Sequence, residues 1–427
     1  MARAENIVVT GAGALCASGK QPAEIWEAIC AGRSALSPIR QWDTAGWPRQ
    51  IAGEIQDLDP VALLKDRKIQ KLIRRSDVFG LYAADQAIAM SGITRYRDSL
   101  SEAAAAQYSD RTGVYVGSGG GSYQSQYDYF PLLTSSEGDL HKFGRELGDT
   151  VNPMWLLRTL PNNVLCHVGI RHNLKGPNAC ITNHSVSGVL AIVEAMEALR
   201  NGEADRALAV GHDAPIEPQM LLYFHRLGLL ARESIRSFDA SRDGSLFGEG
   251  AAGVMLETRA SAAARGAAVI GEVLGSGYTS DAEGLLDIDP DGVALSDAIQ
   301  LALDDAQLNP SDVGMIVGHA NGTPHSDVSE ASAILRVFGA QVPPVTGFKW
   351  AFGHLITASG IIEAVLALSG LAARTVPGIA TLRSLDPAVA GLPVSASAAT
   401  PRSDVALVLA RGFSGTNIAL LLRARAG

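Results

Sequence analysis

The sequence predicts a mixed α/β fold in which helical layers cover the sheets. Short apolar runs lead directly into glycines at 7–13 and 111–121, as buried strands that end in tight turns do. Between such runs, the apolar residues of longer segments recur at helical spacing. With 427 residues, 47% of them hydrophobic, the chain is long enough for two large halves with cores of their own, or for one duplicated domain.

In the first half, the pattern predicts a buried strand at 7–10, an amphipathic helix over 21–34 and an irregular, proline-broken stretch over 35–63. A basic run, KDRKIQKLIRR, then leads into an Ala-rich helix. Residues 122–160 hold aromatic residues and prolines, and we expect an insertion that covers a pocket or a subunit interface.

The most distinctive segment is GPNACITNHSVSGVLAIVEAMEALRNG, which runs from Gly176 to Gly202. It predicts a turn, a short strand, a tight bend and a long helix that ends just before Gly202. Ser185 lies at the bend, near the positive end of the helix dipole, where strained strand-to-helix turns hold out a nucleophile. A serine there is also a common helix N-cap, so the segment alone leaves both roles open.

The second half of the chain repeats the order of predicted elements found in the first, in which strands enter glycine-rich loops and alternate with helices. It predicts a strand at 314–317 that enters the loop HANGT, helices at 292–306 and 359–373, and a closing hairpin, VALVLARGFSGTNIALLLRA. We therefore expect an internal duplication, with an N-terminal half at 1–258 and a C-terminal half at 259–427.

Composition argues against several classes of protein. The net charge of −9 does not suit nucleic-acid binding. The four cysteines form no CxxC pair and no HExxH occurs, so we expect neither a metal site nor a disulfide framework. Cys16 stands where a dinucleotide-binding motif starting at IVVTGAG would need its third glycine. Without a signal-peptide pattern or an apolar run of about 18 residues, we expect a cytoplasmic protein with no membrane span.

Further candidate residues lie in the second half. His319 follows the apolar run MIVG, and Lys349 and His354 stand five residues apart in FKWAFGHLITASG. A lone buried histidine is usually a satisfied core residue, but two in glycine-rich bends beside a lysine and a serine elbow favour a catalytic site. The turn GFSG at 412–415 could present backbone N–H groups toward an oxyanion.

In their order and spacing, these motifs resemble those of the β-ketoacyl-acyl-carrier-protein synthase family of condensing enzymes, over essentially the whole chain. The matching segments are IVVTGAG, RTGVYVGSGGG, the GPN…SVSG elbow, NGEADRALAVG, FDASRDGSLFGEGAAGVMLE, GYTSDAEG, GHANGTPHSDVSE, FKWAFGH and GFSGTN. The resemblance implies the thiolase fold, with two similar α/β halves in five αβαβα layers. It also implies a homodimer, or a heterodimer with a related ketosynthase chain.

Family roles carry over position by position. The resemblance places the nucleophile at Ser185, the two catalytic histidines at His319 and His354, the structural lysine at Lys349, and the acid that pairs with this lysine at Glu330. These residues would move acyl groups that an acyl carrier protein delivers on its phosphopantetheine arm. No bound cofactor or metal is implied.

The resemblance also implies contacts for the substrate and the carrier protein. Phe413 corresponds to the gating phenylalanine, and its N–H would form the oxyanion hole with that of Ser185. The residues expected to contact the acyl group or the phosphopantetheine arm are Thr323, Asn321 (where the family usually has a second threonine), Gly120 and Ser414. Those expected to meet the acidic carrier protein are Lys71, Arg74 and Arg75.

The elbow departs from the family, which normally has Thr-Ala-Cys where this chain has Asn-His-Ser at 183–185. A helix N-terminus lowers the pKa of a thiol, whereas a serine hydroxyl needs a general base. His319 or His354 could take the proton. His184 is adjacent, but in an extended bend its side chain would point away from its neighbour. Cys180 is expected to pack as a small hydrophobe rather than to replace the nucleophile.

Four functions remain open. The chain could be an active condensing enzyme, or a form of one in which serine replaces a native cysteine. It could be a natural serine variant that transfers, hydrolyses or decarboxylates acyl groups, a non-catalytic partner like a chain-length factor, or a binding module. The full set of residues around the elbow favours the first two. Our main expectation is decarboxylative condensation of acyl and malonyl groups in fatty-acid, polyene or polyketide synthesis. Many members of the family carry a larger apolar residue at the position of Gly120, so the glycine either leaves room for a longer or more rigid acyl chain or only forms a tight turn.

Overall fold

The computed structural model describes residues 7–119 and 129–425. Within these residues, ten strands form one mixed sheet. In chain order they are β1 (Ile7–Cys16), β4 (Thr112–Ser118), β5 (Asn178–Ile181), β6 (Arg206–Asp213), β7 (Gly250–Thr258), β8 (Gly271–Ser280), β9 (Met315–Val317), β10 (Val345–Thr346), β11 (Val405–Arg411) and β12 (Thr416–Ala424). A separate small sheet pairs β2 (Ser37–Pro38) with β3 (Ile51–Ala52).

The strand order repeats about the middle of the large sheet. One half has the order β5-β4-β6-β7-β1, and the other has β10-β9-β11-β12-β8. The halves join where β1 pairs antiparallel with β8. In each half a helix follows the edge strand, α11 (Ser187–Arg200) after β5 and α17 (Ser359–Ala372) after β10. This is the duplicated α/β architecture that the sequence predicted.

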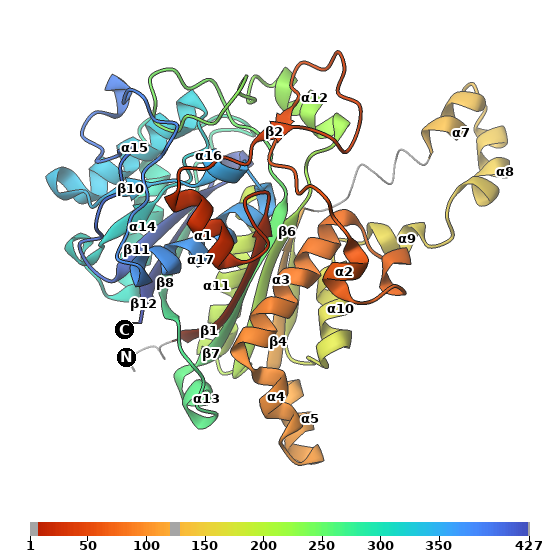
Figure 1. The fold of residues 1–427 in the computed structure, drawn as a ribbon, viewed down its shortest axis with the longest axis horizontal. Helices are drawn as coiled ribbons and strands as arrows, with labels where there is room; N and C mark the ends of the chain where they lie inside the picture. The colour runs from red at the N-terminus through yellow and green to blue at the C-terminus, as the bar shows by residue number, and fades with distance from the viewer. Residues whose placement is uncertain (1–6, 120–128, 426–427) are drawn as a thin grey trace.

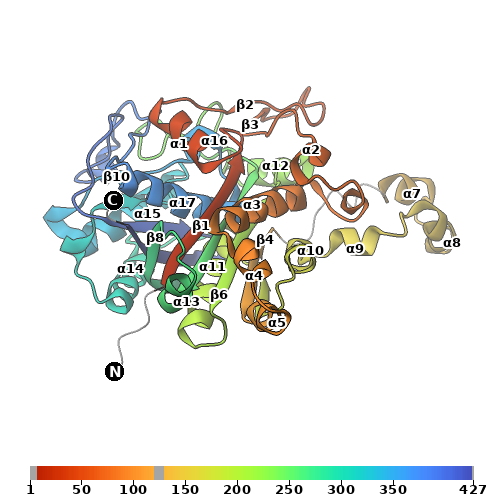
Figure 2. The same ribbon diagram turned by 60° about the horizontal axis from the view of Figure 1, so that its bottom comes forward.

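Helices form three layers around the two halves of the sheet (Figures 1 and 2). α11 packs on β4 and β6, α17 packs on β11 and β12, and the two helices contact each other in the central layer. α3 (Arg75–Ser91) covers β1, β6 and β7 from outside, and α14 (Val293–Ala306) covers β8 and β12. Successive residues of a strand face opposite sides of the sheet. Val114 and Val116 of β4 therefore belong to the hydrophobic cluster formed with α3, and Tyr115 belongs to the one formed with α11.

Shorter helices surround these layers. In the described residues of the predicted insertion at 122–160, a helical arm projects from the body beyond α10 (Asn163–His172; Figure 1). The helices of the arm are α7 (Phe130–Ser135), α8 (Leu140–Thr150) and α9 (Trp155–Thr159). The remaining α-helices of the described residues are α1 (Pro22–Cys30), α2 (Pro60–Leu64), α4 (Ile93–Asp98), α5 (Glu102–Asp110), α10 (Asn163–His172), α12 (Pro218–Arg226), α13 (Arg259–Ala264), α15 (Pro324–Phe338) and α16 (Lys349–Phe352). Nowhere in the described chain is a helix both long and apolar enough to cross a membrane.

Candidate active site

The elbow has the strand-bend-helix form that the sequence predicts. β5 ends at Ile181, a single 3₁₀ turn covers His184–Val186, and α11 begins at Ser187. The N-cap of α11 is Val186, so Ser185 does not cap the helix. Ser185 is buried, and its hydroxyl oxygen lies 2.9 Å from Nδ1 of His184.

The contact between His184 and Ser185 depends on the backbone of His184. Its φ of 46° lies in the left-handed region, which is uncommon for residues other than glycine. The hydroxyls of Ser187 and Thr357 donate to the His184 carbonyl at 2.9 and 3.3 Å and hold this conformation. The expectation that His184 points away from Ser185 assumed an extended bend, and it is wrong because the bend is left-handed.

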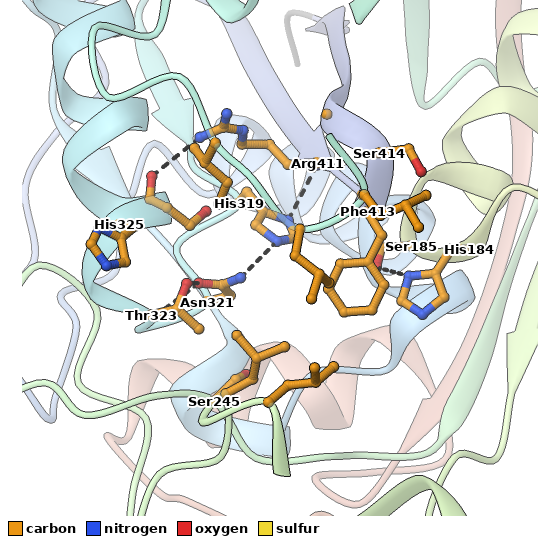
Figure 3. A pocket seen from close by; sticks show the side chains of 18 of the residues that line it. His184, Ser185, Ser245, His319, Asn321, Thr323, His325, Arg411, Phe413 and Ser414 are labelled. Carbon is orange, nitrogen blue, oxygen red and sulfur yellow. Dashed lines mark hydrogen bonds between the residues drawn. The ribbon is translucent and has the colours of Figure 1, made fainter. Parts of the chain in front are cut away.

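Ser185 lines a pocket of about 250 Å³ into which most of the predicted site residues converge (Figure 3). The rings of His319, which follows β9, and His354, which follows α16, meet edge to face with centroids 5.2 Å apart. The predicted residues that line this pocket are Ser185, His319, Asn321, Thr323, His354, Phe413 and Ser414. Gly120 lies outside the described residues.

Hydrogen bonds indicate which ring nitrogen carries the proton in each of the two facing histidines, His319 and His354. The backbone N–H of Arg411 donates to Nδ1 of His319 at 3.3 Å, and that of Ile356 donates to Nδ1 of His354 at 3.2 Å. A backbone N–H can only donate, so each neutral ring carries its proton on Nε2. Burial, assisted by the nearby lysine ammonium, holds the pKa of both rings well below 6.5. Both imidazoles are therefore neutral hydrogen-bond donors at neutral pH.

Asn321 brings a second donor to His319. Its Oδ1 accepts hydrogen bonds from the N–H and hydroxyl of Thr323, at 2.9 and 2.8 Å, so its NH₂ group is directed the other way. This Nδ2 lies 3.2 Å from Nε2 of His319. Two N–H donors thus stand side by side, and an oxygen atom with developing negative charge placed against both would satisfy them.

Lys349 lies behind the pocket and is fully buried. Its ammonium donates to Oε1 of Glu363 at 2.7 Å and to the carbonyl oxygen of His319. Burial raises the pKa of Glu363 to about 7, although the lysine opposes this shift. Sequence reasoning missed Glu363, yet a signal was present, because it is the one charged residue in the apolar stretch SGIIEAVLALSGLA.

The assignment of Glu330 as the acid that pairs with Lys349 is therefore wrong. The Glu330 carboxylate instead accepts the backbone N–H groups of His319 and Ala320, at 2.5 and 2.9 Å. Glu330 lies on α15 and supports the loop that carries His319. The two hydrogen bonds offset the free-energy cost of burying its carboxylate.

Three aromatic rings close one side of the pocket. The rings of His184 and Phe413 stack with centroids 4.7 Å apart, and Phe224 of α12 lies 5.4 Å from Phe413. The same three residues also line a second cavity of about 590 Å³ with Gly119 and Tyr223. They therefore form a partition between two cavities. No motif in the sequence marked Phe224.

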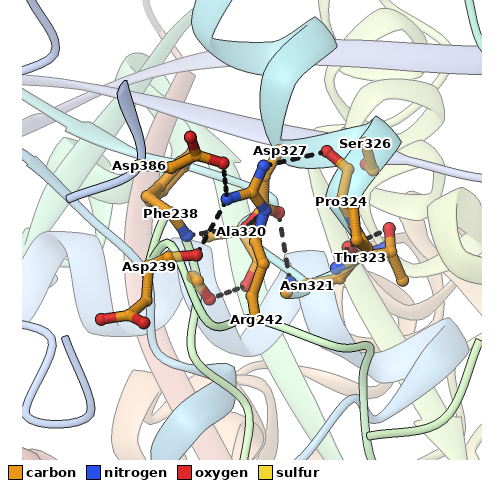
Figure 4. A network of polar contacts seen from close by, with 12 residues as sticks. Phe238, Asp239, Arg242, Ala320, Asn321, Thr323, Pro324, Ser326, Asp327 and Asp386 are labelled. Atoms are coloured by element: carbon orange, nitrogen blue, oxygen red, sulfur yellow. Dashed lines mark hydrogen bonds and ion pairs between the residues drawn. The ribbon is translucent and has the colours of Figure 1, made fainter. Parts of the chain in front are cut away.

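A buried ion-pair network supports the loop that carries Asn321 (Figure 4). Nε of Arg242 lies 3.6 Å from Oδ2 of Asp327, and the guanidinium of Arg242 also forms an ion pair with Asp386. The Asp327 carboxylate also accepts the N–H groups of Phe238 and Gly322, at 2.7 and 3.1 Å. Burial raises the pKa of Asp327 to about 7. The network ties the loop after β9 to the chain around Arg242.

Two of the residues expected to meet a carrier protein are engaged inside the molecule. Arg74 is buried, with its Nε 3.5 Å from Oδ2 of Asp77. Nε of Arg75 donates to Oε2 of the buried Glu249 at 2.8 Å. Both face inward because α3 begins there and its first turn packs on the sheet. The prediction that Arg74 and Arg75 meet a carrier protein is therefore wrong. The exposed basic residues of this stretch are Lys65, Arg67, Lys68 and Lys71.

Cys180 does not reach the pocket. It is half-buried on the edge strand β5, and its Sγ lies 3.4 Å from the carbonyl oxygen of Pro161. Burial raises the pKa of its thiol. Within the described residues, His, Cys, Asp and Glu side chains form no group of three that could hold a metal ion.

The five-layer arrangement is that of thiolase-fold ketosynthases. The chain belongs to the β-ketoacyl synthase family: the family model of the N-terminal domain matches residues 4–262, and that of the C-terminal domain matches residues 270–383. It is 30% identical to 3-oxoacyl-[acyl-carrier-protein] synthase 2 of Coxiella burnetii and 31% identical to that of Synechocystis, with 98% of each chain covered in both comparisons.

Solved structures show the same fold over 99% of this chain and all of theirs. A β-ketoacyl synthase from Burkholderia phymatum superposes with a TM-score of 0.87, and the ishigamide ketosynthase/chain length factor with 0.86. A type II PKS acyl-carrier protein in complex with its ketosynthase gives 0.83. Each is 26% identical to this chain.

Proposed function

We propose that the protein carries out decarboxylative condensation of acyl and malonyl groups on an acyl carrier protein, with Ser185 as the acyl acceptor. The observation that carries this proposal is the shared pocket of Ser185, His319 and His354, in which both histidines are neutral and protonated on Nε2. Fatty-acid, polyene or polyketide synthesis would use this reaction.

The residues present suit each half of the reaction. The Ser185 oxygen attacks the carbonyl carbon of an acyl thioester, and the C–S bond breaks to leave an ester. A malonyl thioester then binds with its carbonyl oxygen against the Nε2–H groups of His319 and His354 and the amide of Asn321. The bond to its carboxyl group breaks, CO₂ leaves, and these donors stabilise the enolate. The enolate carbon attacks the ester carbonyl, the ester C–O bond breaks, and the departing Ser185 oxygen takes up a proton from water.

An oxyanion site is proposed at the elbow, formed by the backbone N–H groups of Ser185 and Phe413. A Cβ atom at Gly412 would lie 3.9 Å from the Ser185 nitrogen, so the turn before Phe413 runs close to the elbow. An oxygen ester is a poorer electrophile than a thioester, so the final step is expected to be slow.

A carrier protein is the proposed partner, because several relatives are named as acyl-carrier-protein synthases and one solved ketosynthase is bound to such a protein. The exposed residues Lys65, Arg67, Lys68 and Lys71 offer an acidic partner a basic surface.

A second copy or a related chain is proposed to cover the edge of the sheet. β5 ends the sheet, and the arm of α7, α8 and α9 exposes apolar side chains that a monomer would leave in water. These are Phe130, Leu133, Leu140, Leu156, Leu157 and Leu160. Light scattering on Leu140→Lys/Leu156→Lys should show a monomer where the unchanged protein is a dimer.

The short contact between His184 and Ser185 favours a second candidate function. A base held against the hydroxyl suits a serine acyltransferase or hydrolase that stops at transfer, hydrolysis or decarboxylation without condensation.

Intact-protein mass spectrometry with acyl-loaded and malonyl-loaded carrier protein tests these functions, with Ser185→Cys and Ser185→Ala alongside. Condensation predicts an adduct on the unchanged protein and a β-ketoacyl product. An adduct that only hydrolyses or transfers supports the second candidate. A product from Ser185→Cys alone identifies a condensing scaffold whose nucleophile is blocked. If no form reacts until a second ketosynthase chain is added, the protein is a chain-length-factor-like partner and the proposal is wrong.

A further inference from the structure

We infer that His184, rather than His319 or His354, is the general base that activates Ser185. This inference rests on the proposed function of Ser185 as acyl acceptor. All three histidines line one pocket, and Figure 3 shows His184 beside Ser185 and His319 beside Asn321.

The geometry places a ring nitrogen of His184 within hydrogen-bond distance of the reacting oxygen. Nδ1 lies 2.9 Å from the Ser185 hydroxyl, inside the range required of a general base. The ring is held by its stack on Phe413, and the backbone by the hydroxyls of Ser187 and Thr357. A strained left-handed residue kept in place by several contacts is typical of a functional site.

The two facing histidines cannot take this role in their neutral form. Each uses the Nδ1 lone pair to accept a backbone N–H, so its Nε2 already carries a proton. A proton from Ser185 would have no lone pair to enter on either ring. Burial lowers the pKa of His184 to about 4, so this ring too is neutral at physiological pH, and its Nδ1 can accept.

The transfer step balances within these groups. As the Ser185 oxygen forms its bond to the thioester carbonyl carbon, its proton moves to Nδ1 of His184. When the tetrahedral intermediate collapses, the C–S bond breaks and the imidazolium returns the proton to the departing thiolate, which leaves as a thiol. His184 ends neutral, and Ser185 carries the acyl group as an ester.

The test compares His184→Asn in two backgrounds, because asparagine tolerates the left-handed backbone but cannot accept the proton. With octanoyl N-acetylcysteamine thioester as the probe, mass spectrometry follows acylation in a single turnover. With Ser185 present, His184→Asn should slow acylation by about 10²–10⁴-fold, the usual contribution of a general base. In a Ser185→Cys background the same change should cost no more than about threefold, because a thiolate needs no base.

Each outcome decides the inference. Equal slowing in both backgrounds would mean that His184 only shapes the elbow, and undiminished acylation with Ser185 would mean that another base acts; either overturns the inference and leaves the proposed function standing. If the unchanged protein is never acylated at Ser185, both fail. Acylation of the double variant also shows that the elbow still folds around the substitution.

Discussion

Lys349 and Glu363 form an ion pair between α16 and α17, with 2.7 Å between Nζ and Oε1 and both side chains fully buried. The lysine also holds the carbonyl of His319. The pair therefore links the central helix layer to the loop that carries a candidate catalytic group.

Glu363→Gln should destabilise the protein by about 3–5 kcal/mol, because it leaves the Lys349 ammonium buried without its counterion. Guanidinium unfolding measures the change. The double variant Lys349→Met/Glu363→Leu removes both charges at similar volume and should recover most of the loss. A single variant as stable as the unchanged protein would contradict this account of the pair.

Acylation of Ser185 should depend on pH through His184. Burial lowers the pKa of this ring to about 4, and only the neutral form accepts a proton. The single-turnover rate should therefore stay level as pH falls from 8 and decline only on approaching pH 4. The decline should be missing in His184→Asn. A midpoint between about 6 and 7 would indicate a histidine of ordinary pKa instead.

Asp327 should make stability fall as pH rises. Burial raises its pKa from 3.8 to about 7 in the folded protein, so the folded state binds more protons than the unfolded chain between these values. The contribution is fully present below pH 3.8 and is lost as pH rises through about 7. Urea unfolding of Asp327→Asn should show a weaker loss between pH 5 and pH 8. Asp386→Asn is the control, since the pKa of Asp386 is lowered and its contribution changes only in acid. Equal slopes for both variants would refute the prediction.

Charge reversal should affect carrier-protein binding when it is made at exposed lysines, and stability when it is made at a buried arginine. Lys68→Glu/Lys71→Glu should weaken carrier-protein binding about tenfold at low salt and reduce its salt dependence, because both side chains are exposed. Fluorescence anisotropy with labelled carrier protein measures this effect. Arg74→Glu should instead lower the melting temperature, since it places a second carboxylate beside the buried carboxylate of Asp77. Unchanged binding by the lysine variant would place the docking surface elsewhere.

Much of the site could be predicted because it lies on local patterns. The elbow around Ser185, the loop after the strand that ends at Val317, and the glycine turn before Phe413 each directly follow a strand that the sequence pattern indicates. Phe224 and Arg411 could not be placed from sequence. Phe224 reaches the pocket from a separate helix, and Arg411 contributes through its backbone N–H.

The sequence by itself determined the alternation of strands and helices, the duplication, and the placement of Ser185, His319 and His354 in bends that follow apolar or glycine-rich segments, because hydrophobic periodicity and glycine turns are local properties of the chain. Only the tertiary structure decided that Glu363 rather than Glu330 pairs with Lys349, that Arg74 and Arg75 are held inside, and that His184 faces Ser185. Ion-pair choice depends on distances between helices far apart in sequence, and the direction of His184 depends on one left-handed backbone angle held by hydroxyls from two elements.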